Sequence, residues 1–337
     1  MQEILNKLRA VTDEDREKLL TTSFSKFDMF SNCQRRYKKT YEEKLRSESS
    51  TLPLELGSIL HKGLEMKGNY LIAGEEVDYE VIRKTVMDGC DEISEKDTEH
   101  LYGINEIKNR YFDVWFKSLE DELNKSYPEK IDIYLNEVLP TRMEDEGWTV
   151  KGTEIPFEFV YDNRCIIHGF IDRVDEKIRT EKDDRTILKV IDYKSSKRVF
   201  MDSKIKTPLQ MVIYDLACLF IYGTIPEYHE YDFILLNKKQ TTEDGVCTRG
   251  YLKRGLKKID VILDKIDQAK KENEYPPSPT PLCYWCPYPD KMHTPNADEK
   301  YGGECQYYSL WKPNHKVFEV NQEYIPGEEK PKRRLVF

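Results

Sequence analysis

The sequence contains no apolar run that approaches the roughly 20 residues needed to cross a bilayer. Its N-terminal segment, residues 1–20, carries too many charged side chains for a secretory signal. We therefore expect a cytoplasmic protein with no membrane partner. Thiols stay reduced in that compartment, so metal binding or burial explains the 8 cysteines better than disulfides do.

An excess of positive charge is also missing. The chain has 53 lysines and arginines against 62 aspartates and glutamates, and its formal net charge is −9. Nucleic-acid-binding proteins are more often basic, because the neutralisation of phosphates supplies much of their affinity. The balance therefore counts against a uniformly basic binding surface. It is compatible with a local basic groove and with acidic clusters that hold divalent cations.

The chain has 337 residues, of which 39% are hydrophobic and 12% aromatic, as is typical of a folded globular protein. No internal repeat is present. We expect an amphipathic helix over 1–20, a second helix capped by Ser23 or Ser25, and a third that carries His61. The highly charged segment 75–145 has a helical pattern and is expected to form an insertion.

Strands and helices then alternate. Three successive strands are expected at 152–162, 164–176 and 186–194, and a charged turn precedes the third. A helix, a strand and an amphipathic helix follow, at 207–223, 227–237 and 254–274. This order predicts an α/β protein. Its expected parts are an N-terminal helical part at 1–74, the insertion at 75–145, the core at 146–275, a cysteine-rich segment at 276–320 and a flexible tail at 321–337.

The residues that indicate chemistry lie on the last two of the three strands. Asp192 and Lys194 are two positions apart, so they share one face of a strand. Asp172 ends the apolar run of the preceding strand, and a hairpin would set it beside Asp192 at one end of the sheet. Two clustered carboxylates repel each other unless a cation lies between them, and oxygen ligands of this kind favour Mg²⁺ or Mn²⁺. A lysine one pleat away can hold a water and stabilise charge on a phosphate, which suits phosphodiester hydrolysis.

An isolated Asp-x-Lys is usually a chance pair on a solvated strand edge. Here it follows the apolar stretch 187–191, which is typical of a central strand. An unpaired aspartate and lysine would be costly to bury there, and this favours a functional role.

Four motifs occur together and in order: GSILHKGLE, HGFIDRVD, VIDYKSS and QMVIYDLA. They resemble the motifs of the PD-(D/E)XK nuclease superfamily, in the branch with the RecB-type nuclease domain and the CRISPR adaptation exonucleases. The resemblance covers roughly residues 23–311, except for the helical stretch 75–140. It implies a restriction-endonuclease-like fold, in which helices flank a mixed central sheet, and a metal-dependent nuclease of bacterial or phage-like type.

The resemblance also implies roles for individual residues. His61 would be a metal ligand on a helix, Asp172 and Asp192 the metal-binding carboxylates, and Lys194 the catalytic lysine. The backbone carbonyl of Tyr193 would be a further metal ligand.

The helix predicted at 207–223 carries a further motif of the superfamily. Gln210 and Tyr214 match its Q-x-x-x-Y motif, which organises the site and contacts DNA. Glu154 falls where related chains carry another acidic residue. Taken alone, His61 would usually be structural, and Gln210 and Tyr214 would as often be plain helix surface.

The cysteines form a second constellation. Cys283 and Cys286 make a C-x-x-C pair between prolines, and Cys305 follows in the same irregular segment. This spacing suits a structural zinc or an iron–sulfur cluster, with the distant Cys33 as candidate fourth ligand. The iron–sulfur branch of the superfamily places one cysteine before the core and three after it, which implies a 4Fe–4S cluster. The long interval before Cys305 departs from that branch, and His293 within it keeps a zinc site as the alternative.

Basic residues beside aromatic ones are candidate DNA contacts. Arg35 and Arg36 precede Tyr37, an arrangement that can grip phosphates and stack on bases, or can be a solvated helix face with its tyrosine buried. Lys197 and Arg198 follow the Asp-x-Lys motif, near the expected scissile phosphate.

Together these features predict a DNA exonuclease. We expect it to act on single-stranded DNA or duplex ends in recombination, repair or phage DNA metabolism, with room for a recombination or replication protein as partner. The alternatives are a structure-specific or nicking endonuclease of the same fold, and a non-catalytic iron–sulfur DNA-binding subunit.

Overall fold

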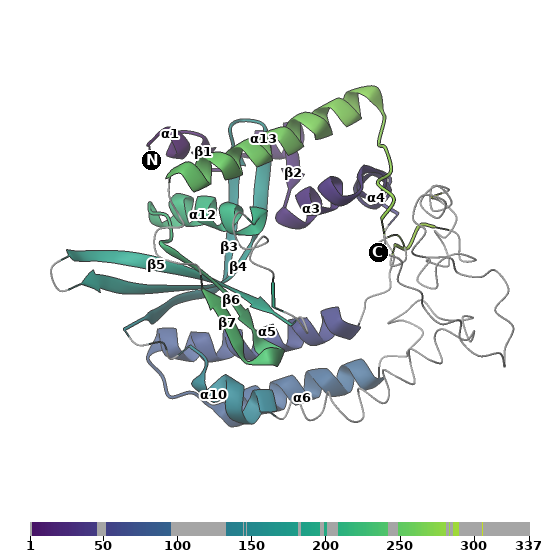
Figure 1. Cartoon of the computed structure of the whole chain (residues 1–337). Helices are drawn as coiled ribbons and strands as arrows, with labels where there is room; N and C mark the ends of the chain where they lie inside the picture. The colour runs from purple at the N-terminus through teal and green to yellow at the C-terminus, as the bar shows by residue number, and fades with distance from the viewer. Residues whose placement is uncertain are drawn as a thin grey trace, which may run out of the picture.

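The computed structural model describes residues 2–45, 52–95, 133–143, 145, 147–180, 183–195, 199–200, 208–241, 249–280, 283, 286–289 and 305. A seven-stranded sheet forms the centre, with the strand order β1-β3-β4-β5-β6-β7 and with β2 paired to β4 (Figure 1). The pairs β5–β6 and β2–β4 are parallel and the others are antiparallel. The expected fold class, a mixed sheet flanked by helices, is confirmed.

The three expected central strands are present, and each is longer than its sequence pattern. They are β3 (Thr149–Tyr161), β4 (Cys165–Thr180) and β5 (Asp183–Lys194). Most of the charged segment that was expected to be the turn is therefore strand. The other expected strand is β6 (Tyr228–Phe233), and β7 (Lys238–Thr241) was not expected.

The expected single helix over 1–20 is wrong. The segment forms α1 (Gln2–Leu5), β1 (Leu8–Arg9), α2 (Asp13–Lys18) and β2 (Leu20–Thr22). The helix α2 starts after Thr12 because the Thr12 hydroxyl accepts from the Asp15 N–H at 3.3 Å, while the Thr12 N–H donates to the Asp15 carboxylate at 2.9 Å. The short strands extend the sheet beside β3 and β4. The next helix, α3 (Phe24–Asn32), is capped by Ser23, one of the two expected caps.

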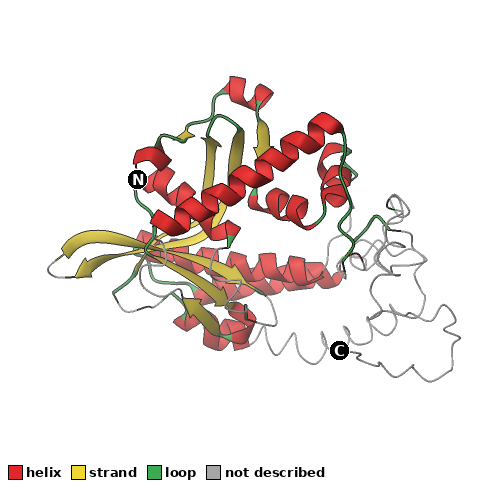
Figure 2. Ribbon diagram, turned by 45° about the horizontal axis from the view of Figure 1, so that its top comes forward, coloured by secondary structure: helices red, strands yellow, loops and turns green. Residues whose placement is uncertain are grey.

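Helices cover both faces of the sheet (Figure 2). On one face, α3, α12 (Leu209–Tyr222) and α13 (Arg249–Glu272) enclose the larger apolar core. On the other, α5 (Leu52–Ala73) and α6 (Tyr79–Glu95) enclose a smaller core with η2 (Tyr134–Val138) and α10 (Leu139–Thr141). Figure 1 shows these two layers above and below the sheet.

Helix α5 packs closely against the sheet. A Cβ added at Gly68 would clash with Cγ2 of Thr153 on β3, so only glycine lets the helix come this near. His61 lies seven residues earlier, two turns along the helix and therefore on nearly the same face. The contact consequently brings His61 down toward the strands.

The side-chain alternation of β3 and β4 is broken at one level of the sheet. On β4, Ile171 and Val174 are three residues apart, yet both lie in the larger core. On β3, the break coincides with Glu154, whose φ of +45° is a left-handed conformation. Beyond the break, the strands turn the opposite set of side chains toward α5. The predicted metal ligands lie at this level.

A buried lysine anchors the far end of the insertion, the described part of which is helical. The ammonium of Lys67 on α5 donates to the carbonyls of Leu139, Pro140 and Arg142, at 2.9, 2.6 and 2.7 Å. Residues 96–132 and the predicted tail lie outside the described residues, and the domain boundaries stay predictions. Within the described ranges, no helix is long and apolar enough to cross a membrane.

Candidate active site

Three carboxylates stand in one row across neighbouring strands. Glu154 on β3 lies opposite Asp172 on β4, because the residues on either side of them pair in register. Asp172 and Asp192 likewise occupy the next position beyond the antiparallel pair of Arg173 with Ile191. The β4–β5 hairpin therefore sets the two aspartates side by side, and β3 adds a third acidic residue.

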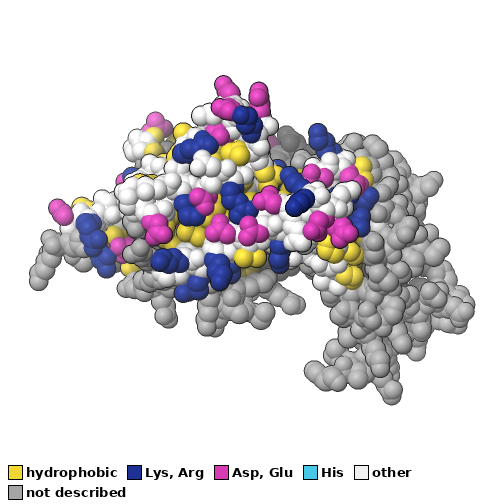
Figure 3. Space-filling model, turned by 90° about the horizontal axis from the view of Figure 1, so that it is seen from above, with side chains coloured by type: hydrophobic (Ala, Val, Ile, Leu, Met, Phe, Trp, Pro, Cys, Tyr) yellow, Lys and Arg dark blue, Asp and Glu magenta, His cyan; other side chains and the backbone are white. Residues whose placement is uncertain are grey.

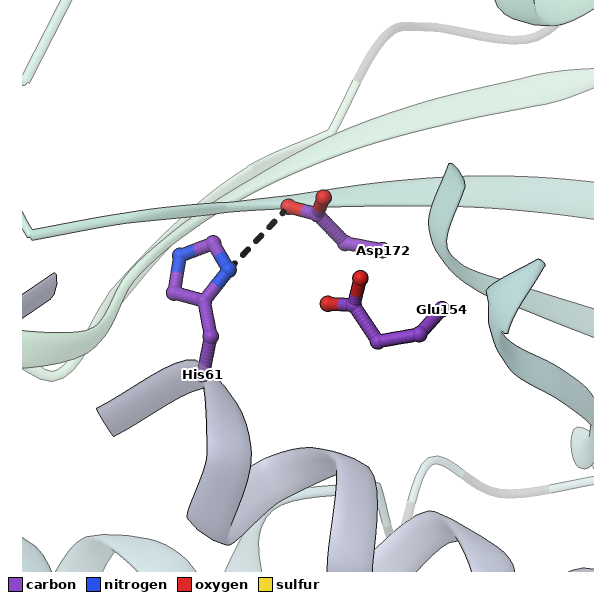
Figure 4. A group of neighbouring side chains, drawn as sticks. All are labelled: His61, Glu154 and Asp172. Carbon is purple, nitrogen blue, oxygen red and sulfur yellow. Dashed lines mark ion pairs between the residues drawn. The ribbon is translucent and has the colours of Figure 1, made fainter. Parts of the chain in front are cut away.

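His61 faces this row from α5 (Figure 4). Its Nδ1 lies 3.8 Å from Oδ2 of Asp172, and ligand atoms of His61, Glu154 and Asp172 all lie within 4.8 Å of one another. No other group of three or more potential metal ligands is this close among the described residues. Burial and the nearby Lys194 ammonium lower the pKa of His61 to about 4. The imidazole is therefore neutral near pH 7, the form that binds a metal.

The carboxylates hold more negative charge than their surroundings neutralise. Burial and repulsion from Asp192 raise the pKa of Asp172 well above its usual range, although the Tyr193 N–H donates to its Oδ2 at 2.7 Å. Burial also raises the pKa of Asp192, which the Lys194 ammonium partly opposes. Burial and Glu65 raise the pKa of Glu154. A divalent cation would relieve this repulsion, so the donor set fits Mg²⁺ or Mn²⁺.

Lys194 is held by two elements at once. Its ammonium forms an ion pair with Oδ2 of Asp192 and donates to Oε1 of Gln210 on α12 at 3.2 Å. The Gln210 amide in turn donates to the hydroxyl of Tyr214 at 2.9 Å. The Tyr214 ring is anchored edge-on against Phe157 of β3, with 6.2 Å between the ring centroids. Gln210 and Tyr214 thus form a chain that fixes the ammonium beside the carboxylate row.

A hollow beside the row is lined in part by residues with no role predicted from the sequence. It lies between His61 and Glu154 and is completed by Ser58, Lys62 and Glu65. These three residues of α5 are three or four positions from His61 or from one another, which puts them on one face of the helix. That periodicity was a signal in the sequence, whereas the left-handed backbone of Glu154 had none.

The four predicted cluster cysteines line a second pocket. Cys33, Cys283, Cys286 and Cys305 all border it and are free thiols. Backbone N–H groups point at two of the sulfurs: that of Arg36 lies 3.5 Å from Cys33 Sγ, and that of Thr280 lies 3.4 Å from Cys283 Sγ.

The chain segments on either side of this pocket are tied together. The hydroxyl of Tyr288 lies 2.7 Å from the Thr40 hydroxyl and donates to the Leu45 carbonyl at 2.5 Å. Segments near the two ends of the chain therefore meet at the cysteines.

Of the predicted DNA contacts, two lie on described residues, and both are at the cysteine pocket. Arg35 and Arg36 line the cysteine pocket. Tyr37 is buried and packs against Phe30 at 5.1 Å between ring centroids, so it is a core residue rather than a stacking surface. Lys197, Arg198 and His293 lie outside the described residues.

The comparison with known families agrees with this geometry. A family model of the PD-(D/E)XK nuclease superfamily matches residues 21–290. The match runs from β2 through the carboxylate row and α12 to the C-x-x-C pair, and it spans well over half of the chain. Nucleases of this superfamily use divalent metals such as Mg²⁺ or Mn²⁺. The chain belongs to the PD-(D/E)XK nuclease superfamily.

Proposed function

We propose that this protein is a metal-dependent deoxyribonuclease that removes nucleotides from DNA ends. The observation that carries the proposal is the row of three carboxylates, in which Glu154 and Asp172 gather with a neutral His61 and Asp192 pairs with the Lys194 ammonium. A fully formed row with its lysine also argues against a non-catalytic DNA-binding subunit, because burying these charges is costly.

The residues of the row have distinct roles in this proposal. His61 and the three carboxylates would hold the cation, with the Tyr193 carbonyl as a further ligand. A bound Mg²⁺ or Mn²⁺ would polarise the scissile phosphate and make water a better nucleophile. Lys194 orients the attacking water and stabilises the charge that develops on the phosphate, and Gln210 keeps its ammonium in position. The Tyr193 N–H orients the Asp172 carboxylate.

For the cysteine pocket we propose a 4Fe–4S cluster. The four thiols border one pocket, and N–H groups directed at sulfur stabilise the thiolate form that ligates iron. A tetrahedral zinc ion, about 2.3 Å from each thiolate, would draw the sulfurs to within about 4 Å of one another. All four cysteines are among the described residues, and no three of their sulfur atoms lie within that distance of one another. This separation favours a larger group over a single ion.

The substrate is proposed to approach from the α5 side rather than from the α13 side. On the face seen in Figure 3, Lys and Arg side chains are interspersed with Asp and Glu. Arg164, for example, pairs with Asp264 and Asp267 of α13 at 2.8 and 2.7 Å. Such pairing leaves little unopposed positive charge for a phosphate backbone. Arg35 and Arg36, and Lys197 and Arg198, remain the proposed phosphate contacts.

We extend the proposal to a role in recombination, repair or phage DNA metabolism, with a protein of those processes as partner. The activity itself is tested with end-labelled single-stranded and duplex DNA in Mg²⁺ or Mn²⁺, beside a covalently closed circle. Exonuclease action predicts loss of the ends and an intact circle. Cleavage of the circle would favour the structure-specific or nicking endonuclease instead, and no cleavage of any substrate would contradict nuclease function.

A further inference from the structure

A large apolar side chain lies exposed next to the carboxylate row. Phe170 on β4 is 58% exposed and stands two residues before Asp172. Its neighbours face the larger core: Ile171 is buried there, and a Cβ added at Gly169 would lie 2.8 Å from the ring of Phe157. The Phe170 ring must therefore point to the opposite face, which is the side from which His61 approaches.

Pro156 on β3 extends this apolar surface. It is the register partner of Phe170, and it is exposed between two residues, Ile155 and Phe157, that pack toward the larger core. Cross-strand partners on one face have Cβ atoms about 5 Å apart, so the ring and the pyrrolidine lie side by side and are called the platform here. Two positions further along the two strands, roughly 7 Å away, Glu154 lies opposite Asp172.

On the side of the platform away from the predicted metal ligands, the charge of the neighbouring carboxylate is neutralised. Glu158, two residues beyond Pro156 on the same face of β3, accepts two hydrogen bonds from the guanidinium of Arg16, at 2.8 and 2.6 Å. A nucleic acid strand that runs from the carboxylate row across Phe170 therefore meets no unopposed carboxylate from Glu158 on that side. The platform is also too small for a stable contact with a second copy of the chain, which needs several hundred Å² per partner.

We infer that Phe170, with Pro156 beside it, is a stacking platform for an unpaired nucleobase of single-stranded DNA. The inference rests on the proposed nuclease function. With the scissile phosphate at the carboxylate row, the base of an adjacent nucleotide lies within reach of the ring. A phenyl ring offers stacking without hydrogen bonds, so the platform accepts every base, with preferences set only by stacking strength. Bases within an intact duplex are already stacked and paired, so the platform acts on single strands and frayed ends.

The test uses a phosphorothioate-protected single-stranded oligonucleotide with 2-aminopurine near its end, together with steady-state cleavage of the unprotected strand. Stacking on Phe170 quenches 2-aminopurine in the wild-type complex. Phe170→Ala is expected to relieve the quenching and to raise KM for single strands about tenfold, with kcat changed far less. Phe170→Tyr should retain both properties. A blunt duplex should be affected less than twofold.

Ile178→Ala is the matched control, because Ile178 lies on the same strand and is 64% exposed but stands away from the carboxylate row. It should behave like the wild type. An active wild type whose KM and quenching survive Phe170→Ala would overturn the platform and leave the nuclease intact. An equal loss on blunt duplex would overturn the restriction to unpaired bases. A wild type that cleaves no DNA would instead remove the proposed function on which the platform rests.

Discussion

The imidazole Nδ1 of His61 lies 3.8 Å from the carboxylate Oδ2 of Asp172, across the junction between α5 and β4. Because the pKa of His61 is lowered to about 4, the two groups are not an ion pair near pH 7. At this distance they do not form a hydrogen bond, and a cation between them could take both as ligands.

Loss of either residue of the Asp-x-Lys pair should greatly slow cleavage and leave the fold intact. Asp192→Asn removes a buried charge at constant shape, and Lys194→Ala removes the ammonium that Gln210 holds. We expect kcat to fall by about 10²- to 10⁴-fold in each variant. End-labelled DNA measures the rate, and circular dichroism checks the fold. Asp184→Asn, at the exposed start of the same strand, is the control that should keep full activity.

Cation binding should stabilise the protein more at high pH than at low pH. Burial raises the folded-state pKa of Asp172 and Asp192 above the unfolded value, so the stability they contribute is present at low pH and lost as pH rises through the folded pKa. Mg²⁺ favours the charged carboxylates and opposes that loss. The increase in Tm on adding Mg²⁺ should therefore be larger at about pH 8 than at about pH 5.5. An increase that does not grow with pH would argue against these ligands.

Gln210 should act through Lys194 rather than through the cation. Gln210→Ala frees the ammonium from its 3.2 Å hydrogen bond, and we expect kcat to fall by roughly 10- to 100-fold with KM nearly unchanged. Tyr214→Phe removes only the hydroxyl that accepts from Gln210 and should have a smaller effect. The rise in Tm with Mg²⁺ should be the same in both variants as in the wild type. Loss of that rise would assign Gln210 to cation binding instead.

The cysteine pocket should contain iron. Anaerobically purified protein is expected to be brown, and Cys33→Ser or Cys283→Ser should bleach it and lower its Tm. Cys165→Ala is the control, because Cys165 is buried in the larger core and should leave the colour unchanged. Metal analysis decides between the alternatives. Stoichiometric zinc in colourless protein would favour a Cys/His zinc site, and stable metal-free protein would contradict both.

Lys67 should be critical for stability. It is fully buried, and its ammonium satisfies three backbone carbonyls at the end of the insertion. Lys67→Met would leave those carbonyls without their donor, and we expect it to lower the free energy of unfolding by about 3 kcal/mol or more. Urea denaturation measures this loss. Lys84→Met, at an exposed position of α6, should change it by less than about 0.5 kcal/mol.

The sequence predicts the centre of this fold well because the central strands carry strong periodic signals. Apolar stretches mark β4 and β5, and the two-residue spacing of Asp192 and Lys194 is enough to assign them to one face of a strand. The helix with Gln210 and Tyr214 is also evident, because its apolar residues recur at helical spacing. For these elements local pattern and tertiary contact agree.

The remaining features depend on contacts that leave little trace in the sequence. Strands β1 and β2 have two and three residues, too few for any alternation, and they form because β3 and β4 offer partners. The break in alternation at Glu154 is a property of the paired strands together. The helical spacing in α5 indicates one side of the hollow beside His61, but its closure by Glu154 and the exposure of Phe170 require the arrangement of α5 against the sheet.

The pocket that joins Cys33 to Cys283, Cys286 and Cys305 has a consequence for biogenesis. The first thiol leaves the ribosome long before the other three, at about 5–20 residues per second, so the nascent chain carries the Cys33 thiol without its three neighbours for tens of seconds. Only a chain translated through residue 305 can complete the set. Contacts between residues so far apart in the sequence form slowly compared with local structure. This pocket is therefore completed late in maturation. Prematurely terminated products that already contain the entire carboxylate row would lack it.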